Sequence, residues 1–229
     1  MSDGSVQGIV EGNVRIPFAS FQRALQLNPG SEQVQRLYAN YATALGRHDE
    51  AIAAAQRAVT LDPISPAAHL VLANSLFAAG RYVESEAAAR RALALQPGRP
   101  SAPAALGWAL MMQGRHEEAL AAFAADPIGW NRRNGRTVVL ARMGRVAEAR
   151  RELELFQHEF GDNAAVQYAE AEAQLGNLDS AMRWLETARR VRDPGLTGVA
   201  FVDPMLEPLH DDPRFRRLLA DLGFDVAPT

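Results

Sequence analysis

The sequence of 229 residues contains no cysteine and no lysine. The absence of cysteine excludes disulfides, thiolate metal sites and cysteine nucleophiles. No apolar run approaches the roughly 20 residues that a membrane-spanning helix needs. The stretch from Met1 to Arg15 lacks the basic and apolar segments of a secretory signal. We therefore expect a cytoplasmic protein without a membrane segment.

The net charge is −3, and all 24 basic residues are arginine. This balance gives no excess of positive charge that would seek a polyanion, so we expect no nucleic-acid partner. The abundance of arginine and alanine is typical of a GC-rich bacterial genome. Alanine also favours helix outside the stretches interrupted by Gly and Pro.

A Gly-Arg or Gly-Asn pair recurs along the chain and is followed, five positions after the Gly, by a small residue. The first three glycines recur at an interval of 34 in the numbering (80 − 46 and 114 − 80), and the next two intervals are 30 and 32. A fixed period of this length indicates stacked supersecondary units. The five glycines are Gly46, Gly80, Gly114, Gly144 and Gly176, and the small residues are Ala51, Ser85, Ala119, Ala149 and Ala181.

Each unit is predicted to contain two helices. In residues 32–45, apolar and small side chains recur at helical spacing, and Gly46 ends the helix because it enters the left-handed region at little cost. A second helix is expected over about 49–61, and Asp62-Pro63 ends it. Pro29, Pro63 and Pro97 keep the same period as the first three glycines.

These residues resemble the tetratricopeptide repeat (TPR), a helix–turn–helix unit with the same period. The resemblance covers about residues 19–193 and implies an all-α, right-handed superhelix of antiparallel helix pairs with a C-terminal capping helix. Three units, in residues 31–126, follow the pattern closely. Two irregular units are expected in residues 127–193, where the interval of 30 suggests a short or re-registered first helix.

The two ends are expected to differ from the repeats. We expect a flexible segment over 1–17 and, over 18–30, the second helix of a repeat whose first helix is missing. Such a helix exposes an apolar flank, so the chain is either a fragment of a longer protein or buries that flank against another copy. Residues 194–229 are expected to form a Pro-rich connection and a capping helix that begins at Asp212-Pro213.

The tail also resembles the end of TPR regions attached to bacterial class III adenylate or guanylate cyclases and to related regulators. The resemblance lies in Asp203-Pro204, Pro208-Leu209, Asp211 to Phe215, Leu218-Leu219 and Leu222-Gly223. It implies a type of module and transfers no catalytic activity, because the sequence contains no cyclase, kinase or winged-helix segment.

The candidate site is the concave face, which the first helices line in the TPR register. Two equivalent amides, Asn40 and Asn74, can each bond both the N–H and the C=O of an extended peptide. An apolar floor of the groove could be formed by Phe77, Trp108 and Met111. In the alternative interpretation, the two aromatic residues pack between adjacent helices. The predicted protein-binding groove comprises Arg36, Asn40, Leu70, Asn74, Phe77, Trp108, Met111, Asn131 and Asn134.

One kind of TPR groove is excluded. A clamp for a C-terminal dicarboxylate needs further cations and an Asn after the pair that Arg36 and Asn40 match. Here Val71, Ser101 and Ala105 fill those positions, so a carboxylate would have too few partners.

Arginines crowd the stretch from 132 to 151, and acidic residues follow it. In one interpretation, these charges are paired between neighbouring units or exposed to solvent. In the other, Arg132, Arg133 and Arg136 contact an anionic ligand.

We find no catalytic constellation, cofactor motif or metal site in the sequence. His48 and His116 lie two units apart in inter-helix turns, and Asn134-Gly135-Arg136 lacks the spacing of a phosphate loop. Three hypotheses follow: a non-enzymatic module that binds a protein or peptide segment in bacterial signalling or regulation, a self-associating regulatory region, and an enzyme with a site around 132–136.

Overall fold

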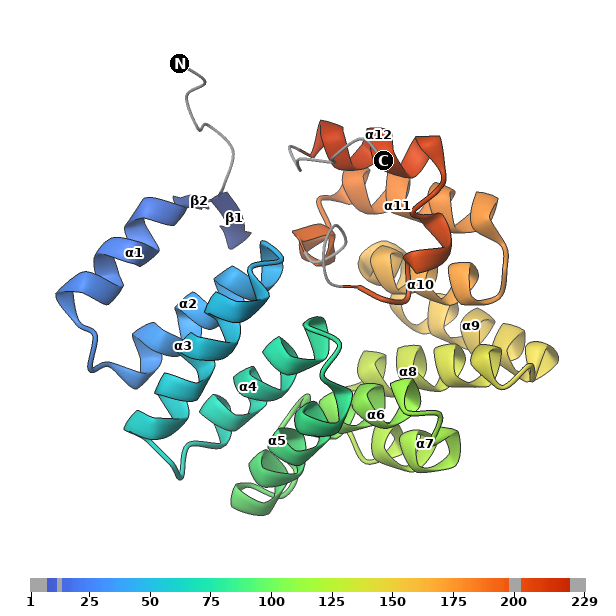
Figure 1. Cartoon of the computed structure of the whole chain (residues 1–229). Helices are drawn as coiled ribbons and strands as arrows, with labels where there is room; N and C mark the ends of the chain where they lie inside the picture. Colours follow the sequence, from blue (N-terminus) through green and yellow to red (C-terminus); the bar gives the residue numbers. More distant parts are fainter. Residues whose placement is uncertain (1–7, 12–13, 198–202, 223–229) are drawn as a thin grey trace.

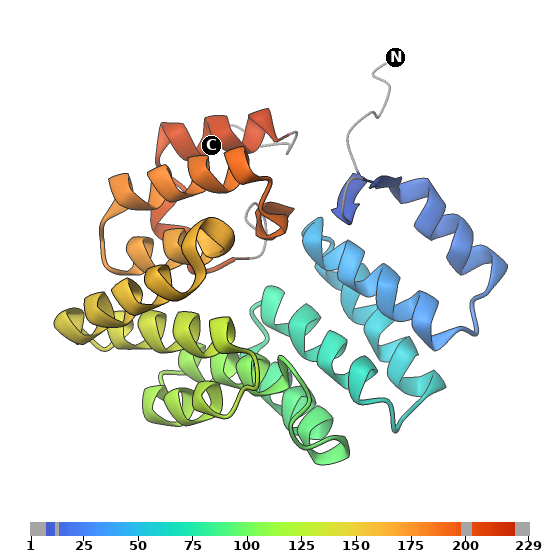
Figure 2. The same ribbon diagram turned by 180° about the vertical axis from the view of Figure 1, so that it is seen from behind.

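In the computed structural model, which describes residues 8–11, 14–197 and 203–222, antiparallel helix pairs follow one another around a strongly curved arc (Figures 1 and 2). Apart from one short hairpin, the described regular structure is helical. The predicted all-α solenoid with a capping helix is confirmed. The helices are α1 (Phe18–Leu27), α2 (Glu32–Ala44), α3 (His48–Leu61), α4 (Pro66–Ala78), α5 (Tyr82–Leu95), α6 (Ala102–Met112), α7 (His116–Ala124), α8 (Gly129–Arg142), α9 (Val146–Phe160), α10 (Ala165–Gln174), α11 (Leu178–Val191) and α12 (Pro213–Asp221).

The turn inside each pair is a Schellman motif built on the recurring glycine. Gly46 has φ of 68°, its N–H donates to the carbonyl of Thr43, and the N–H of Arg47 donates to that of Ala42. The other four turns repeat both bonds, and their glycines have φ between 73° and 79°. The glycine period therefore marks the points where the chain reverses between the two helices of each pair.

The arginine after the glycine has a structural use as well. Arg47, Arg81, Arg115 and Arg145 each form an ion pair with the glutamate three residues on, in the first turn of the second helix. The small residue five positions after each glycine is fully buried, which lets the two helices of the pair approach closely.

First helices form the inner layer of the arc. Successive first helices, from α2 through α4, α6 and α8 to α10, contact one another more extensively than any successive second helices do. In a curved stack the more closely spaced layer lies on the concave side. The concave face is thus lined by α2, α4, α6, α8 and α10, as the TPR register implies.

The irregular fourth unit does not have the short first helix that was one of the two alternatives expected for it. Its first helix, α8, has 14 residues, whereas the preceding second helix, α7, has nine, against 14 in α3 and α5. The interval of 30 therefore arises from a short α7. Asp126, which is buried just after α7, accepts from the N–H groups of Ala104 and Ile128 and fixes the chain reversal there.

Close packing around Phe123 explains two glycines of the first helices. Phe123 lies at 1% exposure between Gly107 of α6 and Gly135 of α8. A Cβ at Gly107 would lie 2.8 Å from the ring, and one at Gly135 would overlap it. Gly135, which has no phosphate-loop spacing, is therefore needed for packing.

The N-terminal segment differs from the flexible chain that the sequence predicts. Strands β1 (Gly8–Glu11) and β2 (Val14–Pro17) form an antiparallel hairpin, in which Ile9 pairs with Ile16. Isoleucine and valine in these strands favour extended backbone. The glycines of the same segment had instead favoured the prediction of a flexible chain. Residues 1–7 and 12–13 of the predicted flexible segment lie outside the described residues.

Beyond α11 the chain forms two short 3-10 turns, η2 (Pro194–Thr197) and η3 (Glu207–Leu209), before α12. Asp212 caps α12 by accepting from the N–H of Arg214, with Pro213 in the first turn. Phe215, Leu218 and Leu219 of α12 pack on the core of the last pair, where Figure 1 shows α12 lying over α11.

Candidate functional site

In each first helix, the position six residues before the turn glycine lies on the concave face. The side chain at this position is more exposed in the first repeats than in the last. Asn40 and Asn74 are exposed, Trp108 is half-buried, and Val138 and Glu170 are buried. We call the part formed by α2 and α4 the open half of the concave face and the part formed by α8 and α10 the closed half. The two halves differ in what covers them.

In the open half, Asn40 and Asn74 have no side-chain hydrogen bond to any described residue, so both amides face solvent with their donors and acceptors unused. Arg36 is paired with Glu32 one turn earlier, and Glu32 also accepts from the hydroxyl of Ser65. The guanidinium of Arg36 is therefore partly neutralised within the protein.

The predicted apolar floor is only partly accessible. Leu70 and Phe77 are half-buried, and the ring of Phe77 lies 5.5 Å from that of Tyr82. Trp108 is half-buried, with its ring edge-on to Phe123 at 4.7 Å. Met111, at 1% exposure, belongs to the core and offers no surface to a ligand in this conformation. Both aromatic residues thus pack on a neighbouring ring and keep some exposed surface, and their use as an apolar floor for a ligand stays a prediction.

The two predicted groove residues of α8 do not face open surface either. Asn131 is half-buried and donates to Ser101 at 3.4 Å. Asn134 is 5% exposed, and its amide nitrogen donates to the carboxyl of Glu170 at 2.7 Å. The amide oxygen of Asn134 is buried without a hydrogen-bond partner among the described residues.

The closed half is covered by residues Asp203–Leu206, which we call the tail turn. The N–H of Leu206 donates to the carbonyl of Asp203 at 3.1 Å, and the N–H of Met205 to its carboxyl at 2.8 Å. Pro204 occupies the second position of this turn, which suits its fixed φ. Figure 1 shows the chain beyond residue 203 passing close to α10 before it continues into α12.

The tail turn is bound to the first helices by polar and apolar contacts. The carboxyl of Asp203 forms a hydrogen bond with that of Glu170, and the carbonyl of Met205 accepts from the amide of Gln174 at 2.7 Å. The Met205 side chain is 2% exposed, in the same buried cluster as Met111 and Val138.

The two facing carboxyl groups have perturbed acidities. Burial, together with the neighbouring Asp203, raises the pKa of Glu170 well above its ordinary value. Burial also raises the pKa of Asp203 to about 6, although the N–H of Met205, the Glu170 hydrogen bond and the charge of Arg142 act in the opposite direction. Near neutral pH the pair therefore holds one proton between two oxygens. The sequence contains one signal for this site, a glutamate at a position that holds Asn, Trp or Val in the other repeats.

The arginine stretch lies on a different surface. Arg132, Arg133 and Arg136 border a cavity of about 440 Å³ between α7, α8 and α9, together with Glu152 and Glu159. Arg133 forms ion pairs with both glutamates, which raise its pKa, and Arg136 pairs with Glu152. Arg132 donates to the carbonyl of Asp126 at 2.7 Å. Neighbouring elements therefore pair most of this charge, and contact with an anion stays a prediction.

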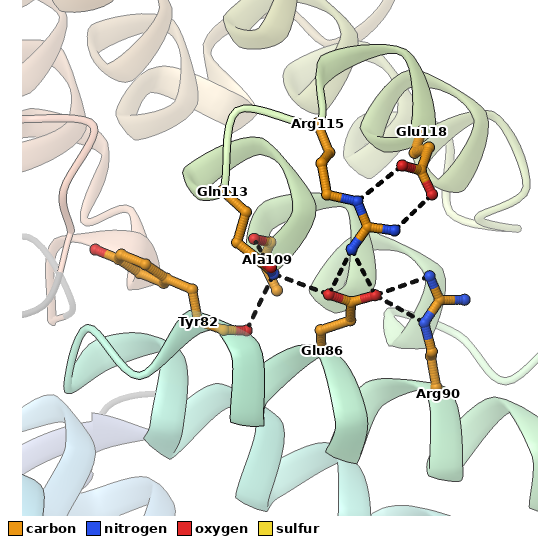
Figure 3. Close-up of polar contacts among 7 residues, drawn as sticks. All are labelled: Tyr82, Glu86, Arg90, Ala109, Gln113, Arg115 and Glu118. Atoms are coloured by element: carbon orange, nitrogen blue, oxygen red, sulfur yellow. Dashed lines mark hydrogen bonds and ion pairs between the residues drawn. The ribbon is translucent and has the colours of Figure 1, made fainter.

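A second polar cluster joins the second and third repeats (Figure 3). The carboxylate of Glu86 on α5 accepts from Arg90, from Arg115 at 2.8 and 2.9 Å, and from Gln113 at 2.9 Å. Arg115 also reaches Glu118, so its guanidinium bridges two carboxylates, while the ring of Tyr82 points away from the cluster. These groups are all matched, so the cluster joins repeats and offers no unpaired charge to a ligand.

Metal or catalytic chemistry gains no support from the described part of the chain. No group of three or more His, Asp or Glu side chains gathers there in a way that could hold a metal ion. His48 and His116 are the first residues of α3 and α7, in separate repeats. Within the same residues, every helix is too short or too polar to span a bilayer.

Comparisons with known proteins agree with the repeat architecture. One tetratricopeptide repeat model matches residues 19–66, 38–100 and 70–129, and another matches 133–154 and 163–187. Together the matches cover more than half of the chain. A search of curated proteins gives no match.

Solved structures show the same fold at low sequence identity. TTC0263, a thermophilic TPR protein from Thermus thermophilus, has a TM-score of 0.60 and 21% identity over 84% of this chain and 98% of its own. A TPR protein from Parabacteroides merdae ATCC 43184 has a TM-score of 0.58 and 13% identity, over 90% of this chain and 84% of its own. PilW, a type IV pilus biogenesis factor, gives 0.55 and 19%, over 83% and 91%.

Proposed function

Because the chain belongs to the tetratricopeptide repeat family, we propose that it is a non-enzymatic interaction module that binds a peptide or protein segment in its concave groove. Stacked helical repeats create extended concave surfaces for such binding. We place the module in bacterial signalling or regulation, in the cytoplasm, on the basis of its composition and of the tail's resemblance to cyclase-associated regions.

The observation that carries this proposal is the pair of exposed amides in the open half. Asn40 and Asn74 occupy equivalent positions in successive repeats, and neither is engaged by another described side chain. An amide can donate to a carbonyl and accept from an N–H of the same extended peptide. Leu70 and Phe77, half-buried beside them, supply apolar surface for a ligand side chain.

Replacing both amides tests the proposal with little risk to the fold. The immobilised full chain is used to capture proteins from a bacterial lysate, with quantification by mass spectrometry. We expect Asn40→Ala with Asn74→Ala to lower recovery of the specific partner at least tenfold, because two side-chain contacts to its backbone are lost. Gln56→Ala, on exposed surface of the outer helix α3, is the matched control and should recover the partner normally.

Helical circular dichroism of each variant shows whether the fold is kept. If the double variant folds and still captures the same proteins at the same level, the open half is not the binding surface.

A second candidate function is that of a self-associating regulatory region in a multidomain protein. It is favoured by the first helix of the array, α1, which has no preceding helix among the described residues. Leu27 of α1 is 69% exposed and Leu37 of α2 is 39% exposed. Light scattering over a concentration series should show mass rising toward a dimer, and Leu27→Ser should lower it. A constant monomer mass at every concentration excludes this candidate.

A further inference from the structure

The closed half already holds a segment of the chain on the surface where a ligand would bind. The tail turn is separated from Glu170 in sequence by the whole of α11, yet it contacts the concave side of α10 through Asp203 and Met205. Glu170 stands at the same repeat position as Asn40 and Asn74, the proposed ligand contacts of the open half.

The contacts of the tail turn are of the kind that a groove makes with a bound peptide. The amide of Gln174 donates to a main-chain carbonyl, and the Met205 side chain fills apolar space in the cluster that includes Met111 and Val138. Arg142 donates to Gln174 at 2.8 Å and thereby holds the amide in place.

We infer that the tail turn is an internal ligand of the concave groove, held through Gln174, Met205 and the protonated carboxyl pair of Glu170 and Asp203, and that ionisation of this pair weakens the docking. The inference deepens the proposed function, on which it rests for the identity of the binding surface. It implies that the groove has a short form, limited to the open half, and a long form that includes α8 and α10.

The direction of the pH dependence follows from the charges around the pair. Glu170 faces Asp203, the more distant carboxylate of Asp193 and the neutral amide of Asn134, whereas the nearby cation that acts on Asp203 is Arg142. Docking buries the carboxyl of Asp203 and so disfavours its ionisation, and a second negative charge on Glu170 would be repelled by the first. Docking is therefore strongest below the ordinary aspartate pKa of about 4 and weakens as pH rises through about 6.

Hydrogen–deuterium exchange on the full chain measures this docking without any partner. After correction for the intrinsic rate of each amide, we expect protection of residues 203–209 to fall about tenfold or more between pH 5 and pH 8. A rise of the Asp203 pKa from 3.8 to about 6 gives this factor, and Glu170 adds to it. Amides of α2 to α5 should keep their protection.

Two variants isolate the titrating pair. Asp203→Asn keeps an acceptor for the N–H of Met205 and removes one titrating group, so the pH dependence should shrink. The double variant Glu170→Gln with Asp203→Asn removes both groups, and protection should become independent of pH. Asp211→Asn, whose side chain is fully exposed on the same tail, is the matched control and should respond like the unmodified chain.

Equal protection of residues 203–209 at pH 5 and pH 8 in the unmodified chain would overturn the inference. The same conclusion would follow if the double variant and Asp211→Asn showed the same pH response. If both variants of the pair lose helicity, the pH dependence of exchange in the unmodified chain still tests the inference. A groove that captures no partner contradicts the proposed function, whereas a docked turn whose protection does not depend on pH contradicts only the weakening of docking by ionisation of the pair.

Discussion

The two halves of the concave face are built from the same repeat but differ in the exposure of their side chains. In the open half, the position six residues before the turn glycine holds the solvent-facing amides of Asn40 and Asn74; in the closed half it holds the buried Val138 and Glu170. The backbone motif is the same in both halves, since all five Schellman turns recur. The difference therefore lies in side chains and in the tail turn, which shows how a repeat can keep its scaffold while its surface becomes core.

The charge environment of carboxyl groups also differs between a repeat junction and the closed half. At the junction of the second and third repeats, partial burial raises the pKa of Glu86 but the hydrogen bonds from Gln113, Arg90 and Arg115 outweigh it, so the pKa lies below its ordinary value. In the closed half, burial and a like charge raise the pKa of Glu170, and burial raises that of Asp203. Lowering the pH therefore weakens the ion pairs of Glu86 and strengthens the contact between Glu170 and Asp203.

The largest effect should come from Gly135→Ala in the closed half. A methyl group there would overlap the ring of Phe123, which cannot move away because Gly107 packs against the same ring. We expect a net loss of about 2 kcal/mol or more in the free energy of unfolding, because overpacking outweighs the roughly 1 kcal/mol that Ala gains over Gly in a helix. Urea denaturation followed by circular dichroism measures it.

The control for this substitution is Gly30→Ala, since a Cβ at Gly30 meets no atom within 4 Å. Phe123→Leu should make Gly135→Ala less costly, so the two losses would be less than additive. Additive losses would show that the ring and the glycine do not constrain each other. In hydrogen exchange, amides of α7 to α10 should lose protection in Gly135→Ala, while those of α2 to α4 should keep it. This result would show that the two halves differ in local stability.

The parts of the structure that were predictable are those encoded locally. Each helix pair was predicted because a Schellman turn needs a glycine at one position, and the glycine period is visible in the sequence. The short α7 was not predicted, since an interval of 30 gives the length lost and not the helix that loses it. The hairpin of β1 and β2 was missed because short strands carry a weak signal.

The candidate site was predictable only where its residues face solvent. Asn40 and Asn74 lie on exposed surface as the repeat register implies, whereas Met111 and Asn134 are buried. Asn134 donates to Glu170 of α10, and Met111 shares a buried cluster with Met205 of the tail turn. The tail turn contacts α10 through residues on either side of α11, and no periodicity records that contact. Long-range contacts of this kind follow from the fold and from no local pattern.

A smaller effect is expected from Glu86→Gln at the repeat junction. The glutamine keeps one acceptor but loses the charge that Arg115 and Arg90 contact, so we expect a loss of about 1 kcal/mol at pH 7, reduced by solvent screening at the exposed arginines. A carboxyl with a lowered pKa stabilises the fold above its ordinary value of 4.5, and this stabilisation disappears as pH falls through the lowered value. The variant and the unmodified chain should therefore differ at pH 7 and converge as the pH falls through the lowered pKa of Glu86, as urea denaturation from neutral to acid pH would show. Glu84→Gln, which loses an exposed ion pair with Arg81 alone, is the matched control. A difference that stays unchanged over the whole pH range would mean that the shape of the Glu86 side chain, and not its charge, holds the two repeats together.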